Sequence, residues 1–280
     1  MAVDFLQGIN WGTAGNWQSG SVPISNDEVA IPETLGSAVT GTPDQGGVDL
    51  DLLRIHTGFD KPIFTSGSPL KIAADLLEHF GSGNLFYTCD ANSVGLKTDE
   101  VLIQCANSRV ITELNSVSGD AGDYTTMTFN RGTVRILGDL TWDANGLIQV
   151  GCVENLASDV NLNIAAGSDV LAQLRQGGGT CVSSRAITVA YVAGTLKQDV
   201  AAITTLHILP GGITTYNWTT ATTVIVYPGA TLNLLGNTVE KTITDLWAMP
   251  KSTVLYDKSL FTGTNKRAGY DFHDYRLERA

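Results

Sequence analysis

The sequence predicts an all-β chain built as a single-stranded parallel β-helix, a β-solenoid in which successive coils stack on one another. Short runs with alternating apolar residues recur about every twenty residues in the second half of the chain. Each run meets a Gly or Pro-Gly corner, and the corner glycines Gly194, Gly211 and Gly229 are 17 and 18 residues apart. The composition agrees, because 30 glycines with frequent Thr, Asn and Val favour short strands and tight turns over long helices.

The coils themselves have a common form: a short apolar-alternating run, a corner, and a second short run. Stacked coils place equivalent inward side chains about 4.8 Å apart, which explains why Val, Ile and Leu recur around each corner. The corner needs a residue that tolerates an unusual backbone angle, hence Gly. An earlier, looser copy has its corner at Gly58. The segments of the second half are residues 133–142, 162–174, 187–198, 205–217, 223–235 and 245–257.

The structural alternative is a β-sandwich made of antiparallel hairpins. Asn145-Gly146 is a clear hairpin dipeptide, but such dipeptides are few, and the corners are spaced too widely for simple meanders. One segment predicts a short helix instead. In residues 70–80, Ile72, Leu76 and Phe80 lie four apart and Gly81 follows, so we expect a helix that covers or flanks the stack.

The beginning of the chain predicts a cap over the first coil, in residues 1–45. Trp11 and Trp17 are followed by Val22-Pro23 and by the run Asp27, Val29, Ile31 and Pro32. This string resembles the opening that precedes the first coils of parallel β-helix proteins in bacteriophage virions and bacterial surface passengers. A solenoid must cover its terminal rung. We therefore interpret the two tryptophans as a hydrophobic lid, with a sugar-stacking platform as the alternative.

The end of the chain loses the coil pattern. Residues 46–257 form the predicted solenoid body, and residues 258–280 become aromatic and basic. Aromatic side chains and Arg are enriched at interface anchors. This segment therefore predicts a docking arm, and a tail that folds back over the solenoid is an equally open interpretation. The arm residues are Tyr270, Phe272, Tyr275 and Arg276.

The charge and the apolar pattern argue against two classes of partner. Seventeen Lys and Arg against 28 Asp and Glu give a net charge of −11, which repels a nucleic-acid backbone. No segment predicts a membrane span, since the uncharged stretch from residue 200 to 239 is interrupted by Pro, Gly and Thr. We also read no signal peptide at the N-terminus. The four cysteines are widely spaced, which favours reduced, buried thiols.

No motif predicts a metal site, a cofactor site or an enzyme. The four histidines are dispersed, and the acidic loop with Asp120 and Asp123 lacks the spacing of a calcium-binding EF-hand, so a solvated turn is favoured. The enzymatic alternative is a pair of carboxylates on neighbouring coils that cleaves polysaccharide. The candidates for it are Asp139, Asp143, Asp159 and Asp169.

These observations favour an architectural role. Together with the resemblance, they predict a structural virion protein: a capsid decoration or cement protein of a bacteriophage, bound to the major capsid protein outside the shell and assembled in host cytoplasm. The resemblance also implies a homotrimer, because phage proteins of this kind commonly lie on threefold axes. One alternative is a tailspike or tail-fibre module that binds or depolymerises host polysaccharide. Another is a fragment of a bacterial surface passenger.

Overall fold

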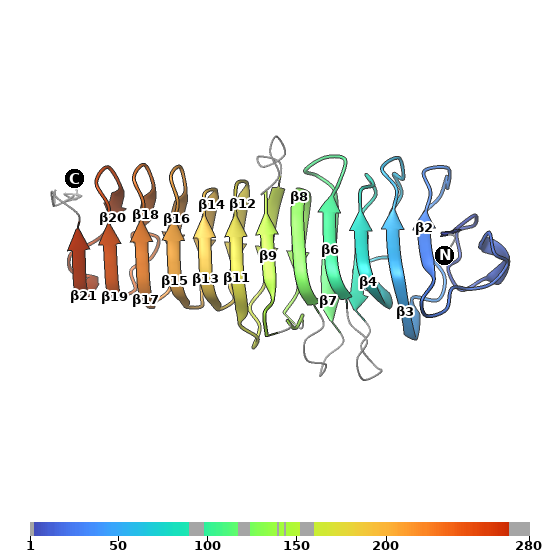
Figure 1. Ribbon diagram of the computed structural model, residues 1–280, viewed down its shortest axis with the longest axis horizontal. Coiled ribbons are helices and arrows are strands. Elements are labelled where there is room, and N and C mark those ends of the chain that lie inside the picture. The colour runs from blue at the N-terminus through green and yellow to red at the C-terminus, as the bar shows by residue number, and fades with distance from the viewer. Residues whose placement is uncertain are drawn as a thin grey trace.

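The protein is described here by a computed structural model covering residues 3–89, 98–116, 124–138, 140–142, 144–151 and 160–268. Over these residues the chain is all-β, as predicted, with 21 strands and a single turn of 3-10 helix, η1 (Ala14–Asn16). The strands lie side by side along one long axis, with β2 and β21 near opposite ends (Figure 1). Every pair of named strands is parallel within the described residues, so the hairpins of a β-sandwich are not found there.

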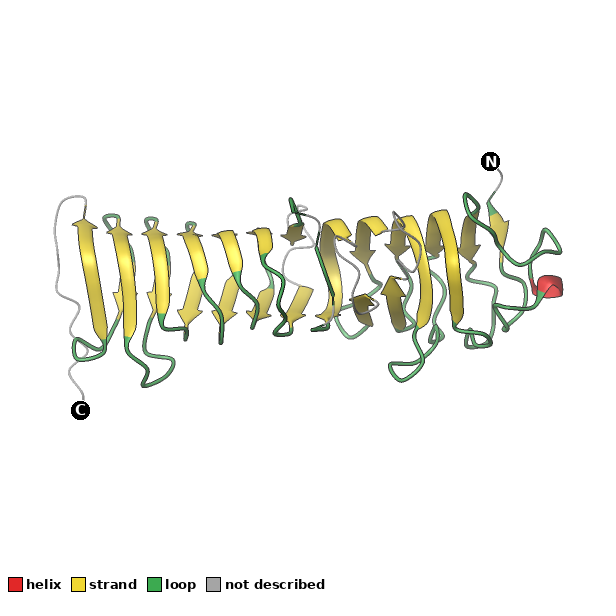
Figure 2. Ribbon diagram, turned by 90° about the horizontal axis from the view of Figure 1, so that it is seen from below, coloured by secondary structure: helices red, strands yellow, loops and turns green. Residues whose placement is uncertain are grey.

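One continuous series of parallel pairs runs the length of the molecule, and we call it stack A. Each of its strands pairs with the next in the series, which usually lies two elements further along the chain. Figure 2 shows the strands side by side along the long axis. Stack A contains β1 (Asp4–Phe5), β2 (Glu28–Ile31), β3 (Asp44–Ile55), β4 (Leu70–His79), β6 (Thr98–Gln104), β8 (Tyr124–Ile136), β9 (Leu147–Val150), β11 (Leu171–Gln176), β13 (Ile187–Val192), β15 (Ile203–Ile208), β17 (Thr220–Val226), β19 (Lys241–Ala248) and β21 (Phe261–Ala268).

A second series of parallel pairs, stack B, follows the same axis. It is joined to stack A through the long strands β4 and β8, which pair in both series. Its other members are β5 (Leu85–Cys89), β7 (Ile111–Ser116), β10 (Val160–Ile164), β12 (Thr180–Ser183), β14 (Thr195–Gln198), β16 (Ile213–Tyr216), β18 (Thr231–Asn233) and β20 (Thr253–Leu255).

The core is made of side-chain ladders that run between the two stacks. In stack A, Ile208 and Val226 are register partners and both are fully buried. In stack B, Leu162, Cys181 and Leu196 are partners in the same way and are equally inaccessible. Because each rung covers the apolar side chains of the next, the core extends along the whole rod instead of forming one central cluster.

The predicted helix at residues 70–80 is wrong, because this segment is strand β4. Its buried residues Ala74 and Leu77 are separated by two residues, Asp75 and Leu76, that are more exposed than either of them. The same interruption recurs between Ile203 and Leu206 of β15. This irregularity of the pleat spaces apolar residues three or four apart, which imitates the period of a helix.

The predicted corner glycines lie where the chain turns between strands of the two stacks. Gly211 and Gly229 have positive φ angles of 84° and 77°, which only glycine adopts without strain. Gly194 has a different reason, since a Cβ there would lie 2.7 Å from the backbone of Gly178 and Gly179. The paired strands begin before residue 46, with β1 and β2, and extend past residue 257, with β21.

Candidate interaction surfaces

Trp11 and Trp17 pack together in the segment between β1 and β2, near the N-terminal tip of the rod. Their rings pack edge to face with centroids 4.9 Å apart, and the Trp17 indole donates a hydrogen bond of 2.8 Å to the Trp11 carbonyl oxygen. Only 0% and 2% of their surfaces are exposed. Their faces are therefore not available to stack on a sugar, and their position suits a lid over the first rungs.

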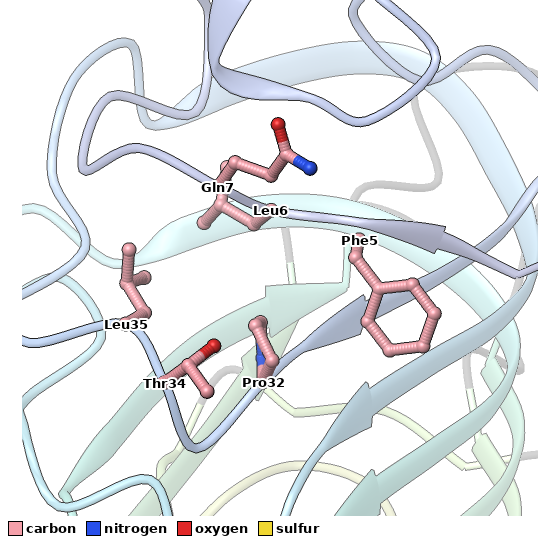
Figure 3. Close-up of a pocket in the computed structure, with 6 residues that line it drawn as sticks. All are labelled: Phe5, Leu6, Gln7, Pro32, Thr34 and Leu35. Atoms are coloured by element: carbon pink, nitrogen blue, oxygen red, sulfur yellow. The ribbon is translucent and has the colours of Figure 1, made fainter.

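A pocket of about 280 Å³ lies beside this tip (Figure 3). It is lined by side chains from the first strand and from the turn after β2. None of them is an acid, a base or a thiol, so the pocket can hold an apolar or hydroxyl group but supplies no acid-base chemistry. The lining residues are Phe5, Leu6, Gln7, Pro32, Thr34 and Leu35.

A second hollow, of about 180 Å³, lies on the outward face of stack A. Two columns of outward residues cross it on consecutive rungs: Leu76 pairs with Glu100, and Glu78 pairs with Leu102. These four side chains therefore stand at the corners of a square, with the two leucines at one pair of diagonal corners and the two carboxylates at the other pair. Thr126 and Thr128 on the next rung, together with the buried Val101, complete the lining.

The two carboxylates of this hollow differ in their surroundings. Glu78 is 8% exposed and forms an ion pair with Arg54, its register partner on β3. Glu100 is exposed and has no ion pair or hydrogen bond among the described residues. The positive charge of Arg54 balances the negative charge of Glu78, so the carboxylate of Glu100 leaves the hollow with one net negative charge.

An edge of stack A carries one equivalent residue on each rung, and its chemistry changes along the rod. Near the N-terminus the residues are Asp27, Asp51, Asp75 and Asp99, spaced 24 residues apart. Each directly precedes one of the register partners Glu28, Leu52, Leu76 and Glu100. Towards the C-terminus the equivalent positions are the exposed threonines Thr188, Thr204, Thr222 and Thr244.

Asp49, close to the aspartate end of this edge, has an unusual protonation equilibrium. Burial raises its pKa from 3.8 to about 6, and the negative charges of Asp75, Asp99 and Asp51 add to the rise. Both causes disfavour the charged carboxylate. The N-terminal rungs therefore carry mutual repulsion at neutral pH.

Aromatic side chains face outward near the other end of stack A. Tyr191 and His207 are register partners whose rings stack with centroids 4.7 Å apart, and the Tyr227 hydroxyl lies 3.5 Å from His207 Nδ1. Burial lowers the pKa of His207. Trp247, two rungs further in the same column, is 38% exposed. Because Tyr191 and His207 stack, each of these two rings covers one face of the other.

Two groups with catalytic potential lie inside the rod. His79 Nδ1 is 2.8 Å from Thr112 Oγ1, its Nε2 is 3.0 Å from the Gly83 carbonyl oxygen, and burial lowers its pKa to about 4. Burial also raises the pKa of the nearby Cys105 thiol to about 12. A neutral imidazole and a protonated thiol without access to solvent have a structural role here.

The structure describes only some of the candidate residues that the sequence analysis selected. The arm residues Tyr270, Phe272, Tyr275 and Arg276 lie outside the described residues, as do Asp120, Asp123, Asp139, Asp143 and Asp159. Asp169 is described, and its carboxylate accepts a hydrogen bond of 3.0 Å from the Trp142 backbone N–H. This hydrogen bond ties two segments of the chain together.

The carboxylate hollow was missed by the sequence analysis. The spacing of four aspartates could have indicated it, because they recur every 24 residues and mark equivalent positions on successive strands of stack A. Glu78 and Glu100 lie close to two of these aspartates in the sequence. Among the described residues no three His, Cys, Asp or Glu side chains gather in a way that could hold a metal ion. The same residues contain no helix with the length and apolar character to span a membrane.

Comparison with known proteins gives no relative for this chain. No family model matches the sequence, no curated protein matches it, and no solved structure matches the fold.

Proposed function

We propose that this chain is a single-stranded parallel β-helix with a structural role, a decoration or cement protein that binds the outside of a bacteriophage capsid and stabilises the shell. The observation that carries the proposal is the parallel stack itself, in which strands at opposite ends of a long axis are joined by an unbroken series of register partners. A rod of this kind can contact subunits that lie far apart. Contacts that bridge subunits stabilise an assembled lattice by mass action.

The outward face of stack B supports self-association of this rod as a homotrimer. One column of register partners there consists of Thr180, Thr195, Ile213, Thr231 and Thr253. These residues are neutral, and Ile213 is 46% exposed. Interface cores are depleted in charged residues, so a column of this composition suits contact with other copies of the chain.

The trimer is tested by the mass of the purified protein in solution. We expect three copies per particle, and we expect Ile213→Glu to give monomers because it places a charge in the middle of the neutral column. Thr244→Glu, on the outward edge of stack A, is the matched control and should remain trimeric. A wild-type protein that is monomeric at high concentration would rule the trimer out.

The capsid role is tested on the bacteriophage particle whose genome carries the gene for this protein. Purified protein should bind particles lacking it, should be visible on their exterior by electron microscopy, and should raise the temperature at which they release DNA. Deleting residues 269–280, the part of the predicted arm that follows β21, should abolish binding if this segment docks on the capsid, with the β-rich circular dichroism spectrum unchanged. Particles whose stability does not respond to the protein would contradict a cement function.

The second candidate is a tail protein that binds or depolymerises host polysaccharide. It is favoured by Glu78 and Glu100, two carboxylates on adjacent rungs of one outward hollow. Incubation with capsular polysaccharide separates the two functions. Release of reducing ends that is lost in Glu100→Gln, and retained in Glu240→Gln, would replace the structural role with an enzymatic one.

A further inference from the structure

The hollow formed by Leu76, Glu78, Glu100 and Leu102 has the chemistry of a receptor for one side chain. Its volume of about 180 Å³ suits one long side chain better than a folded segment. Its four outward side chains alternate between apolar and acidic around the square. A ligand that fits must therefore present an apolar stem and a polar head together.

The charge of the hollow selects a cationic head. Arg54 already neutralises Glu78, whereas Glu100 has no partner among the described residues. One positive charge from outside would neutralise the group. The surroundings act in the same direction, since the first 100 residues hold 13 Asp and Glu against 4 Lys and Arg. This field attracts cations and repels phosphates and acidic polysaccharides.

We propose that this hollow receives a lysine or arginine side chain presented by a partner protein. The aliphatic stem lies against Leu76 and Leu102, and the charged head contacts Glu100 and the hydroxyl groups of Thr126 and Thr128. The proposal rests on the proposed function and deepens it, because it states which chemical group a capsid protein offers to this rod. It also predicts that the N-terminal half of stack A faces that partner.

The test uses the full chain and a fluorescent synthetic peptide with lysines separated by alanines. Glu100→Gln should weaken binding about tenfold at low ionic strength, and Glu100→Lys should weaken it further, because the excess carboxylate is removed or reversed. Glu240→Gln is the matched control. It removes one exposed carboxylate from the other end of the rod and should change the affinity little.

Three outcomes would overturn the hollow as a cation receptor. The first is equal binding of the peptide by wild type and Glu100→Gln, and the second is equal weakening by Glu240→Gln, which would reflect net charge alone. The third is undiminished binding of a peptide in which norleucine replaces lysine. Displacement of the lysine peptide by a neutral oligosaccharide would likewise assign the hollow to a sugar.

The peptide assay contains no capsids, so it fails or succeeds independently of the cement function. If the peptide binds as expected but the protein does not bind particles, the hollow is a cation receptor and the proposed capsid role is wrong. If particles bind the wild type and Glu100→Gln equally well, the capsid role stands and the hollow is not its contact.

Discussion

The guanidinium of Arg185 donates a hydrogen bond of 2.5 Å to the carbonyl oxygen of Leu140, 45 residues earlier in the chain. The same side chain reaches the carbonyl oxygens of Leu137, at 3.2 Å, and Gly138, at 2.8 Å. Arg185 is completely buried. A single cation thus satisfies backbone acceptors at the turn that follows β8, where the regular pairing of stack B cannot do so.

Replacing Arg185 should therefore cost a large part of the stability of the fold. We expect Arg185→Met to lower the free energy of unfolding by about 2 to 4 kcal/mol, because several buried carbonyl groups lose their charged donor. Urea denaturation followed by circular dichroism measures the change. Lys197→Met is the control, since Lys197 is half-exposed and pairs with Asp199 at the surface. A similar loss in both variants would contradict the role of Arg185.

Asp49 should make the protein less stable as the pH rises from about 4 to about 6. Its pKa is about 6 in the folded state and near 3.8 when unfolded, so the folded state binds more protons in this interval. Asp49→Asn should remove this loss and stabilise the protein at pH 7, with little effect at pH 4. Urea midpoints for wild type and variant across this range test it. Parallel curves would show that the carboxylate does not respond to its acidic neighbours.

His79 should act in the opposite direction. Burial lowers its pKa to about 4, against 6.5 in the unfolded chain, so the unfolded state binds more protons between these values. Wild-type stability should consequently fall as the pH decreases from 6.5 to 4. His79→Gln stays neutral and can still form hydrogen bonds, so its stability should show a smaller decrease. The result is read as the difference between the two pH profiles, and an identical decrease would place the acid sensitivity elsewhere.

The buried cysteines should resist modification in the folded protein. Cys89, Cys105 and Cys181 are buried thiols, and burial raises the pKa of Cys181 to about 12. In a Cys152→Ser variant, a thiol reagent such as DTNB should not react until denaturant is added, and should then modify three groups. Rapid reaction of the native variant would mean that a rung opens readily to solvent.

The repeating residues explain how much of the fold could be predicted. Gly211 and Gly229 mark corners because the turn imposes a positive φ angle, and Ile208 and Val226 mark the interior because adjacent rungs need matching apolar side chains. Both requirements are local, and the matching of apolar side chains recurs between successive rungs. For that reason a single sequence predicts an all-β chain with the correct spacing, without any knowledge of how the stacks curve.

The errors have a different origin. The sequence around Asp75 and Leu76 predicts a helix because the pleat is interrupted there, and only the pairing with neighbouring rungs shows that the segment is a strand. The carboxylate hollow depends on register in the same way. Glu78 and Glu100 become neighbours through the pairing of β4 with β6, and that register cannot be derived from either strand alone.

The uniform rung spacing has one more consequence. Each added rung of stack A lengthens the molecule by about 4.8 Å and repeats the inward apolar positions of its neighbours. Gain or loss of one rung by duplication or deletion of its DNA would lengthen or shorten the stack in fixed increments. Evolution can in this way change the length of the molecule without changing how its remaining rungs pack.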